Sequence, residues 1–291
     1  MKKILVLGGS GFIGKNLKEG LQDRYNIVAP RHSELDISNL DELKKYLSRE
    51  RFDVIINSAN TNNTRNTTTS NYEVLDNNLH MFFNLEKCNK LYGKMYYFGS
   101  GAEYDMKHYI PSMKEEYFGK YIPTDPYGFS KYIMSKVCEE SNNIFDLRLF
   151  GVYGKYEEWE RRFISNAICR ALVGKDITIQ KNVFFDYLWV DDLCKIVEWY
   201  VENAPIYKHY NVCRGSSIDL YSLACMVREM LNIDCNIVIK EEGWKPEYSG
   251  NNERLLNEMG KIQFTSYRES IRELCDFYKH NLESIDVSKL N

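Results

Sequence analysis

Short apolar runs alternate with amphipathic stretches along the first half of the chain. The apolar runs are rich in β-branched residues, and they predict strands at Ile4–Leu7, Asn26–Ala29, Asp53–Asn57, Met95–Phe98 and Phe145–Phe150. The stretches between them carry apolar residues at helical spacing, and they predict helices at Phe12–Arg24, Leu40–Leu47, Leu79–Leu91 and Tyr127–Glu140. Strand–helix alternation of this kind favours an α/β fold, in which a parallel sheet carries helices on both faces.

The pattern loosens after Phe150. The charged stretch Lys155–Arg162 predicts a loop, and so does Gly243–Asn252, which holds a proline, two glycines and two asparagines. The asparagine- and threonine-rich stretch Asn60–Asn71 predicts an exposed loop at the ligand-binding carboxyl edge of the sheet, with simple low complexity as the alternative. The remaining predicted helices are Phe163–Val173, Leu193–Val201 (capped by Asp191 or Asp192), Leu220–Leu231 and Ser266–Asn281, and the remaining predicted strands are Ile177–Ile179, Tyr210–Cys213 and Ile237–Ile239.

Composition narrows the class of protein. With 291 residues and a formal net charge of -3, the chain can bury a large core and lacks the basic excess of a general nucleic-acid binder. No apolar run approaches the roughly 18–20 residues that cross a bilayer, so we expect no membrane segment. The eight cysteines form no C-x-x-C pair, which favours reduced, structural thiols and a cytoplasmic protein.

A glycine-rich turn joins the first predicted strand to the first predicted helix. Its sequence is Gly8-Gly9-Ser10-Gly11-Phe12-Ile13-Gly14. Missing side chains let the backbone approach a pyrophosphate, and the start of the helix points its amide dipoles at that negative charge. The strand before it and the helix after it favour a dinucleotide site over a simple tight turn. The candidate cofactor residues in this turn are Gly8, Ser10, Gly11, Phe12, Ile13 and Gly14.

The end of the second predicted strand bears on which dinucleotide binds. NAD sites usually place an acidic residue there for the adenosine ribose, whereas this strand ends without one and continues into Arg31. A guanidinium forms paired hydrogen bonds with phosphate oxygens, so Arg31 favours NADP over NAD, unless it is simply a surface arginine. Further candidate cofactor contacts are Asp36 and Ile37 beside the adenine, and Asn57, Ser58 and Ala59 at the end of the third strand.

Tyr127 and Lys131 are four residues apart in a predicted helix and therefore share one of its faces. A free phenol has a pKa of about 10, and a nearby ammonium together with a positive nicotinamide favours the phenolate. The pair therefore predicts a lowered pKa for Tyr127 and a role as general acid or base, with Lys131 also holding the nicotinamide ribose. Ser100, near the end of strand Met95–Phe98, is the candidate that orients the reacting oxygen.

These motifs together resemble the extended short-chain dehydrogenase/reductase family, also called the NAD-dependent epimerase/dehydratase family. They are the glycine turn, Asp53–Ala59, Gly99–Tyr104, Tyr127–Lys131, Leu147–Gly154 and Asp186–Asp192. The resemblance implies a Rossmann domain and a smaller mixed C-terminal domain, with a nucleotide-sugar substrate in the cleft between them. It also implies the roles given above to Ser100, Tyr127 and Lys131, and it places Asn78 beside the cofactor near the active site.

Departures from the family pattern narrow the reaction. The 4,6-dehydratases that the chain resembles follow the catalytic hydroxyl with Asp and Glu, where this chain has Gly101 and Ala102. GDP-fucose synthase epimerises through a cysteine and a histidine, and this chain has Ala102 and Arg162 at those positions. Dehydration and double epimerisation are therefore not expected. The segment Arg31–Asp36 nevertheless resembles the NADP side of GDP-fucose synthase.

Two substrate positions also depart from the family. The usual asparagine before Val-Tyr-Gly is Gly151, and the usual arginine before the next motif is Phe185. Arg161, Arg162, Lys181 and Arg254 are candidates to replace the lost phosphate contact, and each is alternatively a solvated surface charge. The predicted substrate residues are Ser100, Gly101, Ala102, Tyr127, Arg162 and Arg254, and no metal site is predicted.

The sequence therefore predicts an NADP-dependent reductase of a nucleotide-activated keto sugar of the 4-keto-6-deoxyhexose type, with Tyr127 as the general acid. The alternatives are a C4 epimerase that uses tightly held NAD, and a non-catalytic protein that binds a dinucleotide. We expect residues 1–150 and 177–203 to form the Rossmann domain, and residues 151–176 and 204–291 to form the substrate domain. The resemblance also implies a homodimer that pairs through Leu79–Leu91 and Tyr127–Glu140.

Overall fold

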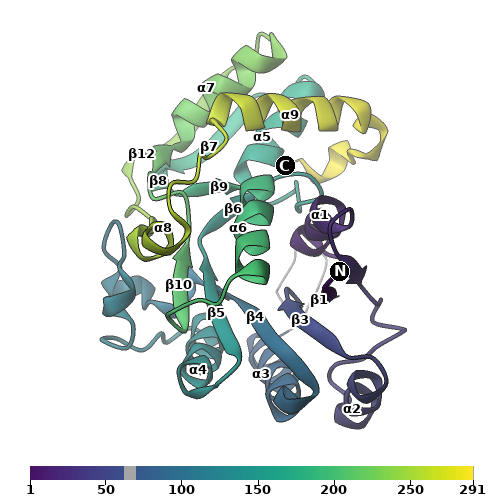
Figure 1. Ribbon diagram of the computed structural model, residues 1–291. Coiled ribbons are helices and arrows are strands. Elements are labelled where there is room, and N and C mark those ends of the chain that lie inside the picture. Colours follow the sequence, from purple (N-terminus) through teal and green to yellow (C-terminus); the bar gives the residue numbers. More distant parts are fainter. Residues whose placement is uncertain (62–69, 291) are drawn as a thin grey trace.

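The computed structural model describes residues 1–61 and 70–290. A six-stranded parallel sheet in the order β10-β5-β4-β3-β1-β2 runs through the larger part of the chain (Figure 1). Because β1 has β2 on one side and β3 on the other, the order reverses there, which is where ligands bind in such sheets. The Rossmann-type fold is thus confirmed. The strands are β1 (Lys3–Leu7), β2 (Asn26–Val28), β3 (Phe52–Asn57), β4 (Tyr92–Ser100), β5 (Ile144–Leu149) and β10 (His209–Val212).

Helices cover both faces of this sheet because successive strand side chains point to opposite sides. In β1, Ile4 and Val6 pack with α1 (Phe12–Leu21) and α6 (Val190–Glu202). Leu5 and Leu7 of the same strand pack toward the other face. That face is covered by α2 (Leu40–Arg49), α3 (Asn71–Lys87) and α4 (Pro126–Glu140), which line the lower edge of the view in Figure 1. Burial on both sides explains why the strands are continuous apolar runs.

The smaller part of the chain has its own apolar core around Ile168, Trp189 and Leu274. Its helices lie above the sheet in Figure 1, away from α2, α3 and α4. They are α5 (Phe163–Leu172), α7 (Leu220–Leu231) and α9 (Tyr267–His280). Helix α8 (Glu253–Met259) instead contacts β10, and its Leu255 is buried in the core of the main sheet. Its strands form the short pairs β6 (Gly151–Tyr153) with β9 (Tyr187–Trp189), β8 (Phe184–Phe185) with β11 (Ile218–Asp219), and β7 (Ile177–Asn182) with β12 (Ile237–Trp244).

Several elements differ from the sequence prediction. β10, assigned above to the substrate domain, is a strand of the main sheet, and β7, assigned to the Rossmann domain, pairs with β12 instead. Helix α3 begins before the predicted Leu79 because Ser70 and Glu73 form a capping box at its start. The predicted loop Asn60–Asn71 lies largely outside the described residues, and α8 was not predicted.

The predicted cap of α6 is also wrong. Its N-cap is Trp189, without a side-chain hydrogen bond, and Asp191 and Asp192 lie inside the first turn. Asp192 is buried there, and its carboxylate accepts from the backbone N–H and the hydroxyl of Thr265, at 2.8 and 2.9 Å. It therefore holds the segment before α9 against α6 and stabilises the join between the two parts of the chain.

A buried arginine fixes the edge of the sheet that leads to the site. Arg148 on β5 donates from Nε to Glu103 at 2.6 Å and to Asp146 at 3.1 Å, and from Nη2 to Ser135 of α4 at 2.8 Å. Arg148, Glu103 and Asp146 are fully buried. A buried cation is tolerated only when its hydrogen bonds are made in this way, and the same bonds tie β5 to α4 and to the turn after β4.

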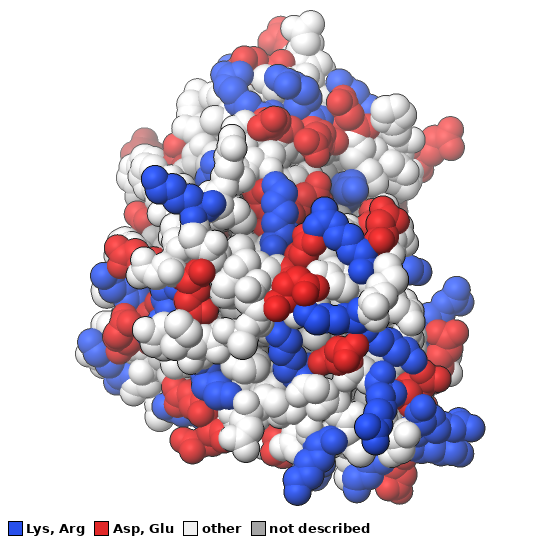
Figure 2. Space-filling model, viewed as in Figure 1, with Lys and Arg blue, Asp and Glu red and all other residues white. Residues whose placement is uncertain are grey.

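The face of the molecule drawn in Figure 2 carries no single dominant charge. Figure 2 shows both signs mixed over this face, with Lys and Arg gathered most densely at the lower right, where α2 lies in Figure 1. All eight cysteines are free, as expected of structural thiols, and all but Cys225 are buried. Within residues 1–61 and 70–290, each helix is too short or too polar to cross a membrane.

Replacement of the buried cation tests its structural weight. Arg148→Met leaves Glu103 and Asp146 without their partner, and we expect the free energy of unfolding to fall by about 3–5 kcal/mol, measured by urea denaturation. Arg268→Met is the matched control, because it breaks an exposed ion pair with Glu229 and is expected to change stability little. Equal stability of the two variants would contradict the assigned weight of the cluster.

Candidate active site

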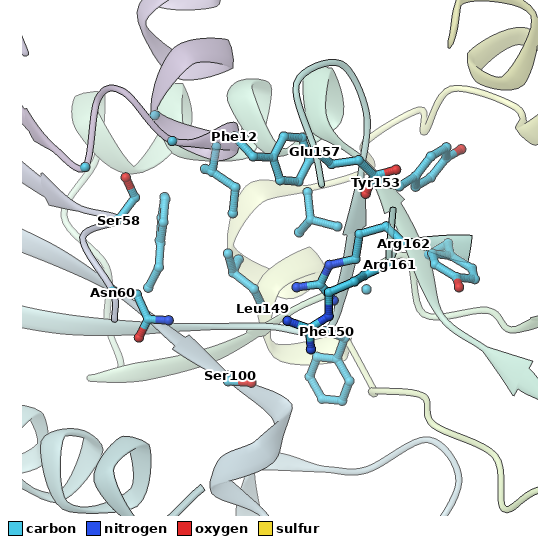
Figure 3. Close-up of a pocket in the computed structure, with 18 of the residues that line it drawn as sticks. Phe12, Ser58, Asn60, Ser100, Leu149, Phe150, Tyr153, Glu157, Arg161 and Arg162 are labelled. Carbon is cyan, nitrogen blue, oxygen red and sulfur yellow. The ribbon is translucent and has the colours of Figure 1, made fainter. Parts of the chain in front are cut away.

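A cavity of about 450 Å³ opens at the carboxyl ends of β1, β4 and β5 and extends under the smaller part of the chain. It joins the glycine turn to the Ser100, Tyr127 and Lys131 set, so the two motifs that are far apart in sequence share one space. Figure 3 shows Phe12 and Ser100 among the residues that line it. Its volume is in the range of small-molecule sites. Other lining residues are Phe12, Ser58, Asn60, Phe98, Leu149, Phe150, Gly151, Val152, Tyr153, Glu157, Arg161, Arg162, Phe163, Ile164, Phe185 and Tyr187.

The glycine turn has the form of a dinucleotide cradle. Gly8, Gly11 and Gly14 line the cavity, and α1 begins there with Gly11 as its N-cap and without a side-chain acceptor for its first N–H groups. Gly14 must lack a side chain, because a Cβ atom would lie 2.3 Å from the carbonyl oxygen of Gly8. The bare helix start and the tight backbone packing fit a pyrophosphate. Of the remaining turn residues, Phe12 and Ile13 line the cavity and Ser10 is exposed outside it.

The residues after β3 are held beside this turn. The Ser58 hydroxyl donates to the Leu7 carbonyl at 2.6 Å and lines the cavity. Asn57 and Asn78 are buried and bond the backbone that follows β3, at Ala59 and Thr61 respectively. They therefore shape the chain beside the cavity, although they are not among the residues that line it.

The candidates for the adenosine end lie farther out, near the end of β2. Arg31 is exposed, and its backbone N–H donates to the Glu34 carboxylate at 2.7 Å. The Asp36 carboxylate accepts from the Ser38 N–H and hydroxyl at 2.9 and 2.7 Å, while Ile37 is buried in the core. These three residues do not line the cavity, and the Arg31 side chain is exposed.

Ser100 lies in a tight turn that the sequence itself encodes. Ser100 and Glu103 form a capping box: the Ser100 hydroxyl oxygen accepts from the Ala102 N–H at 3.1 Å, and Glu103 accepts from the Ser100 N–H at 2.9 Å. The same Glu103 binds Arg148. Sequence reasoning missed Glu103, although a Ser followed three residues later by Glu is a readable capping signal.

Tyr127 and Lys131 project from α4 toward Ser100. Asp125 caps α4 by accepting from the Gly128 N–H at 2.8 Å, which fixes the turn that carries Tyr127. The Lys131 ammonium lies 5.8 Å from the centre of the Tyr127 ring and donates to the Phe98 carbonyl at 3.0 Å. Burial lowers the pKa of Lys131 to about 8, while the nearby Glu103 and Asp146 act in the opposite direction.

The prediction that Tyr127 has a lowered pKa is wrong for the protein without its cofactor, in which the pKa is raised. Burial raises the pKa of Tyr127. A hydrogen bond with Ser100 and the positive charge of Arg162 lower it, but the net effect is a raised pKa. The hydroxyl therefore stays protonated at neutral pH, which is the form that a general acid needs. This desolvation was not predicted, because the sequence does not show whether a single side chain is buried in the fold.

Arginine side chains line the end of the cavity farthest from β3. Figure 3 shows Arg161 and Arg162 reaching in beside Phe150, on the side away from Ser58 and Asn60. Glu157 is buried near them, and burial raises its pKa to about 7, against the hydrogen bond with Ser165 and the charge of Arg162. This end of the cavity therefore offers positive charge together with a carboxyl group that titrates near neutrality.

The two substrate departures noted in the sequence are linked in space. A Cβ atom on Gly151 would lie 2.5 Å from the Phe185 ring, so a larger residue at position 151 is incompatible with this phenylalanine. Of the other substrate candidates, Ala102 follows Ser100 in its turn, and Lys181 lies on β7 outside the cavity. Arg254 also lies outside the cavity. Its guanidinium donates to the Glu116 carboxylate at 2.7 Å and to the His209 carbonyl at 3.2 Å.

Comparison with known proteins agrees with this geometry. The family model described as "NAD dependent epimerase/dehydratase family" matches residues 4–213. An ADP-L-glycero-D-manno-heptose-6-epimerase from Brachyspira hyodysenteriae is 25% identical over 78% of this chain and 80% of its own length. A GDP-6-deoxy-D-talose 4-dehydrogenase from Aggregatibacter actinomycetemcomitans is 24% identical over 98% of this chain and 100% of its own length.

A solved structure shares the fold over nearly the whole chain. The GDP-L-fucose synthetase from Naegleria fowleri bound to NADP superposes with a TM-score of 0.86 at 16% identity. The match covers 97% of this chain and 94% of that chain, so both the larger and the smaller part are included.

The buried charges near Lys131 predict a pH dependence of any activity that needs its ammonium. Lys131 loses its proton as pH rises through about 8, so activity is expected to fall over that range. Asp146→Asn removes a negative charge that favours the ammonium, and the fall is expected to begin at lower pH, measured in a pH–rate profile. Ser135→Ala is the control: it removes the hydrogen bonds of the Ser135 hydroxyl with Asp146, at 2.6 Å, and with Arg148, at 2.8 Å, but no charge, and it should leave the profile in place.

Proposed function

The chain belongs to the NAD dependent epimerase/dehydratase family and is an NAD(P)-dependent enzyme, and from that premise we propose that it reduces a nucleotide-activated 4-keto-6-deoxyhexose. One observation carries the proposal: Ser100, Tyr127 and Lys131 meet in the same cavity as the glycine turn. A proton donor beside a dinucleotide cradle suits the reduction of a carbonyl group.

Tyr127 is the general acid in this proposal. Its protonated phenol transfers a proton to the keto oxygen as that oxygen gains negative charge. Ser100 donates a hydrogen bond to the same oxygen and orients it. Lys131, positively charged below its pKa of about 8, favours the phenolate that Tyr127 becomes. The three groups therefore divide orientation, proton transfer and charge stabilisation among themselves.

The dinucleotide in this proposal is NADP rather than NAD. Gly8, Gly11 and Gly14 would hold its pyrophosphate, and Lys131 its nicotinamide ribose. When bound in its reduced form, this cofactor supplies the hydride for the carbonyl carbon. Arg31 follows β2 with an exposed side chain, and no acidic residue ends that strand, although the Glu34 carboxylate accepts from the Arg31 backbone N–H. The exposed guanidinium suits a 2′-phosphate better than a free ribose hydroxyl.

A nucleotide-sugar is the substrate class that the cavity favours. Arg162 adds a positive charge to the lining, and a guanidinium suits the diphosphate of such a substrate. Gly101 and Ala102 follow Ser100 without the acids that the 4,6-dehydratases resembled by this chain carry there. Reduction without dehydration is therefore the simplest reaction that these residues support. The relative named as a GDP-6-deoxy-D-talose 4-dehydrogenase fits this substrate class.

A C4 epimerase with tightly held NAD is the second candidate. One relative is named as a heptose-6-epimerase, which supports epimerisation as a class of reaction but at a different carbon. An intact Ser100, Tyr127 and Lys131 set argues against a purely dinucleotide-binding protein, which needs no proton donor.

We also propose a cytoplasmic homodimer that pairs through the outer faces of α3 and α4. Its molecular mass in solution tests this pairing, and a monomeric mass would contradict it.

Turnover of a keto sugar tests the central assignment. Purified enzyme given a GDP- or dTDP-linked 4-keto-6-deoxyhexose should consume NADPH, faster than NADH, and Tyr127→Phe should lower kcat by about 10²–10⁴-fold. Arg31→Ala serves as the cofactor control, because it should narrow the preference for NADPH while it leaves the rate with NADH unchanged. Unchanged turnover in Tyr127→Phe would contradict the general-acid role, and sugar interconversion without cofactor consumption would favour the epimerase.

A further inference from the structure

Two phenylalanine side chains form one apolar side of the cavity. Phe150 follows β5 and Phe185 lies on β8, and both line the cavity together with Ser100 and Tyr127. We call these two side chains the apolar wall. They offer no hydrogen bond, so the part of a bound substrate that touches them is stabilised when it is hydrocarbon.

The apolar wall lies next to the residue that orients the reacting oxygen. A Cβ atom on Gly101, which directly follows Ser100, would lie 3.0 Å from the Phe150 ring and 2.3 Å from the Tyr248 hydroxyl oxygen. A Cβ atom on Gly250 would lie 2.7 Å from the same Phe150 ring. The ring therefore fits between two stretches of bare backbone, and close packing holds it beside Ser100.

Aromatic residues behind the apolar wall hold its two rings in place. The centre of the Tyr248 ring lies 5.3 Å from that of Phe150 and 4.8 Å from that of Phe185. Tyr248 is itself fixed, because its backbone N–H donates to the Phe184 carbonyl at 3.0 Å and its ring stacks on Tyr109 at 5.0 Å. Rings packed on one another in this way cannot turn aside to admit a larger group without disturbing their neighbours.

The chemistry of the proposed substrate indicates which part of it meets the apolar wall. In a 4-keto sugar, the reacting carbon lies between C3, which carries a hydroxyl group, and C5, which carries C6. With the keto oxygen at Ser100 and Tyr127, the groups on C3 and C5 are the parts of the sugar nearest to the reaction. An apolar surface deprives a hydroxyl group of hydrogen bonds, whereas it stabilises a methyl group. C6 is therefore the substituent that suits the apolar wall.

We propose that Phe150 and Phe185 are specificity-determining residues, which contact C6 of the sugar and select a methyl group there over a hydroxymethyl group or a longer side chain. A hydroxyl group on C6 would lose its hydrogen bonds to water and gain none from the two rings. A heptose side chain would add a carbon atom as well. This inference rests on the proposed function, because it places the keto oxygen at Ser100.

The polar side chains near the apolar wall have other partners or lie behind it. Arg161 is paired with Glu158 at 3.7 Å, and Arg162 is assigned above to the diphosphate. Tyr109 and Tyr248 are not among the residues that line the cavity, and the Tyr109 hydroxyl donates to the Ser249 carbonyl at 2.9 Å. The two phenylalanine rings therefore remain the surface that C6 meets.

Binding of nucleotide-sugars that differ only at C6 tests the proposal. GDP-D-rhamnose has a methyl group where GDP-D-mannose has a hydroxymethyl group, and neither has a keto group that NADPH could reduce. With NADPH bound, the wild type should bind the 6-deoxy sugar about 5- to 100-fold more tightly, because the hydroxyl of the other sugar is buried unpaired. Isothermal titration calorimetry measures both dissociation constants, and dTDP-6-deoxy-D-glucose with dTDP-D-glucose gives the same comparison for the other nucleotide.

Two substitutions of Phe150 separate polarity from shape. Leu and Asn are close in size, so Phe150→Leu and Phe150→Asn open similar space and differ mainly in polarity. Phe150→Leu should keep the preference for the methyl group, whereas Phe150→Asn offers an amide to the C6 hydroxyl and should reduce the preference to within about threefold. The ratio of the two dissociation constants is the readout, because a general disturbance of the fold weakens both sugars alike. The same ratio in both variants would overturn the role of Phe150.

Phe184→Asn is the matched control for Phe185→Asn. The two residues are neighbours on β8, but Phe184 is exposed and stacks on Trp244 instead of lining the cavity. We expect Phe185→Asn to reduce the preference for the methyl group and Phe184→Asn to leave it unchanged. An equal reduction in both variants would assign the effect to the strand as a whole and overturn the role of Phe185.

The wild-type binding data also separate this inference from the proposed function. If both sugars of a pair bind equally well, or the hydroxymethyl sugar binds more tightly, the apolar wall does not select for C6 and the inference is overturned, while a nucleotide-sugar remains the substrate class. If neither pair binds, the proposed substrate class is rejected and the inference falls with it.

Discussion

The buried ion cluster around Arg148 is the constraint on which the site depends. Arg148 joins β5 to α4 through Ser135 and to the turn after β4 through Glu103. Glu103 in turn holds the backbone N–H of Ser100. The position of Ser100 is therefore set by a cation that does not line the cavity. Such clusters add little net stability, but loss of one partner strands the opposite charges in a medium of low polarity.

The same cluster also acts on Lys131, which lies beside Tyr127. Desolvation lowers the pKa of this lysine, whereas the carboxylates of Glu103 and Asp146 raise it. With the resulting pKa of about 8, the ammonium remains charged near neutral pH. Tyr127 is governed by burial in the other direction and keeps its proton. A protonated phenol next to a charged ammonium is the arrangement that a reduction requires, because the proton leaves as negative charge develops on the substrate oxygen. The protein environment thus matches a general acid better than a resident phenolate.

The sequence predicted what depends on local pattern. The parallel sheet followed from apolar runs with turn residues between them, and the glycine turn and the Tyr127–Lys131 spacing are read directly from adjacent residues. It did not predict that β10 would join the main sheet, because a short apolar run carries no information about its partner. The desolvation of Tyr127 and the approach of the Tyr248 hydroxyl to Gly101 arise from residues far apart in the chain, which only the packed structure brings together.

The fate of the hydride is the most direct test of the account. NADPH deuterated at C4 of the nicotinamide should transfer deuterium to the former keto carbon of a nucleotide-linked 4-keto-6-deoxyhexose, detected by NMR of the product. The account predicts one deuterium at that carbon for each NADP formed. A product without deuterium, or sugars that interconvert while NADPH is not consumed, would contradict it.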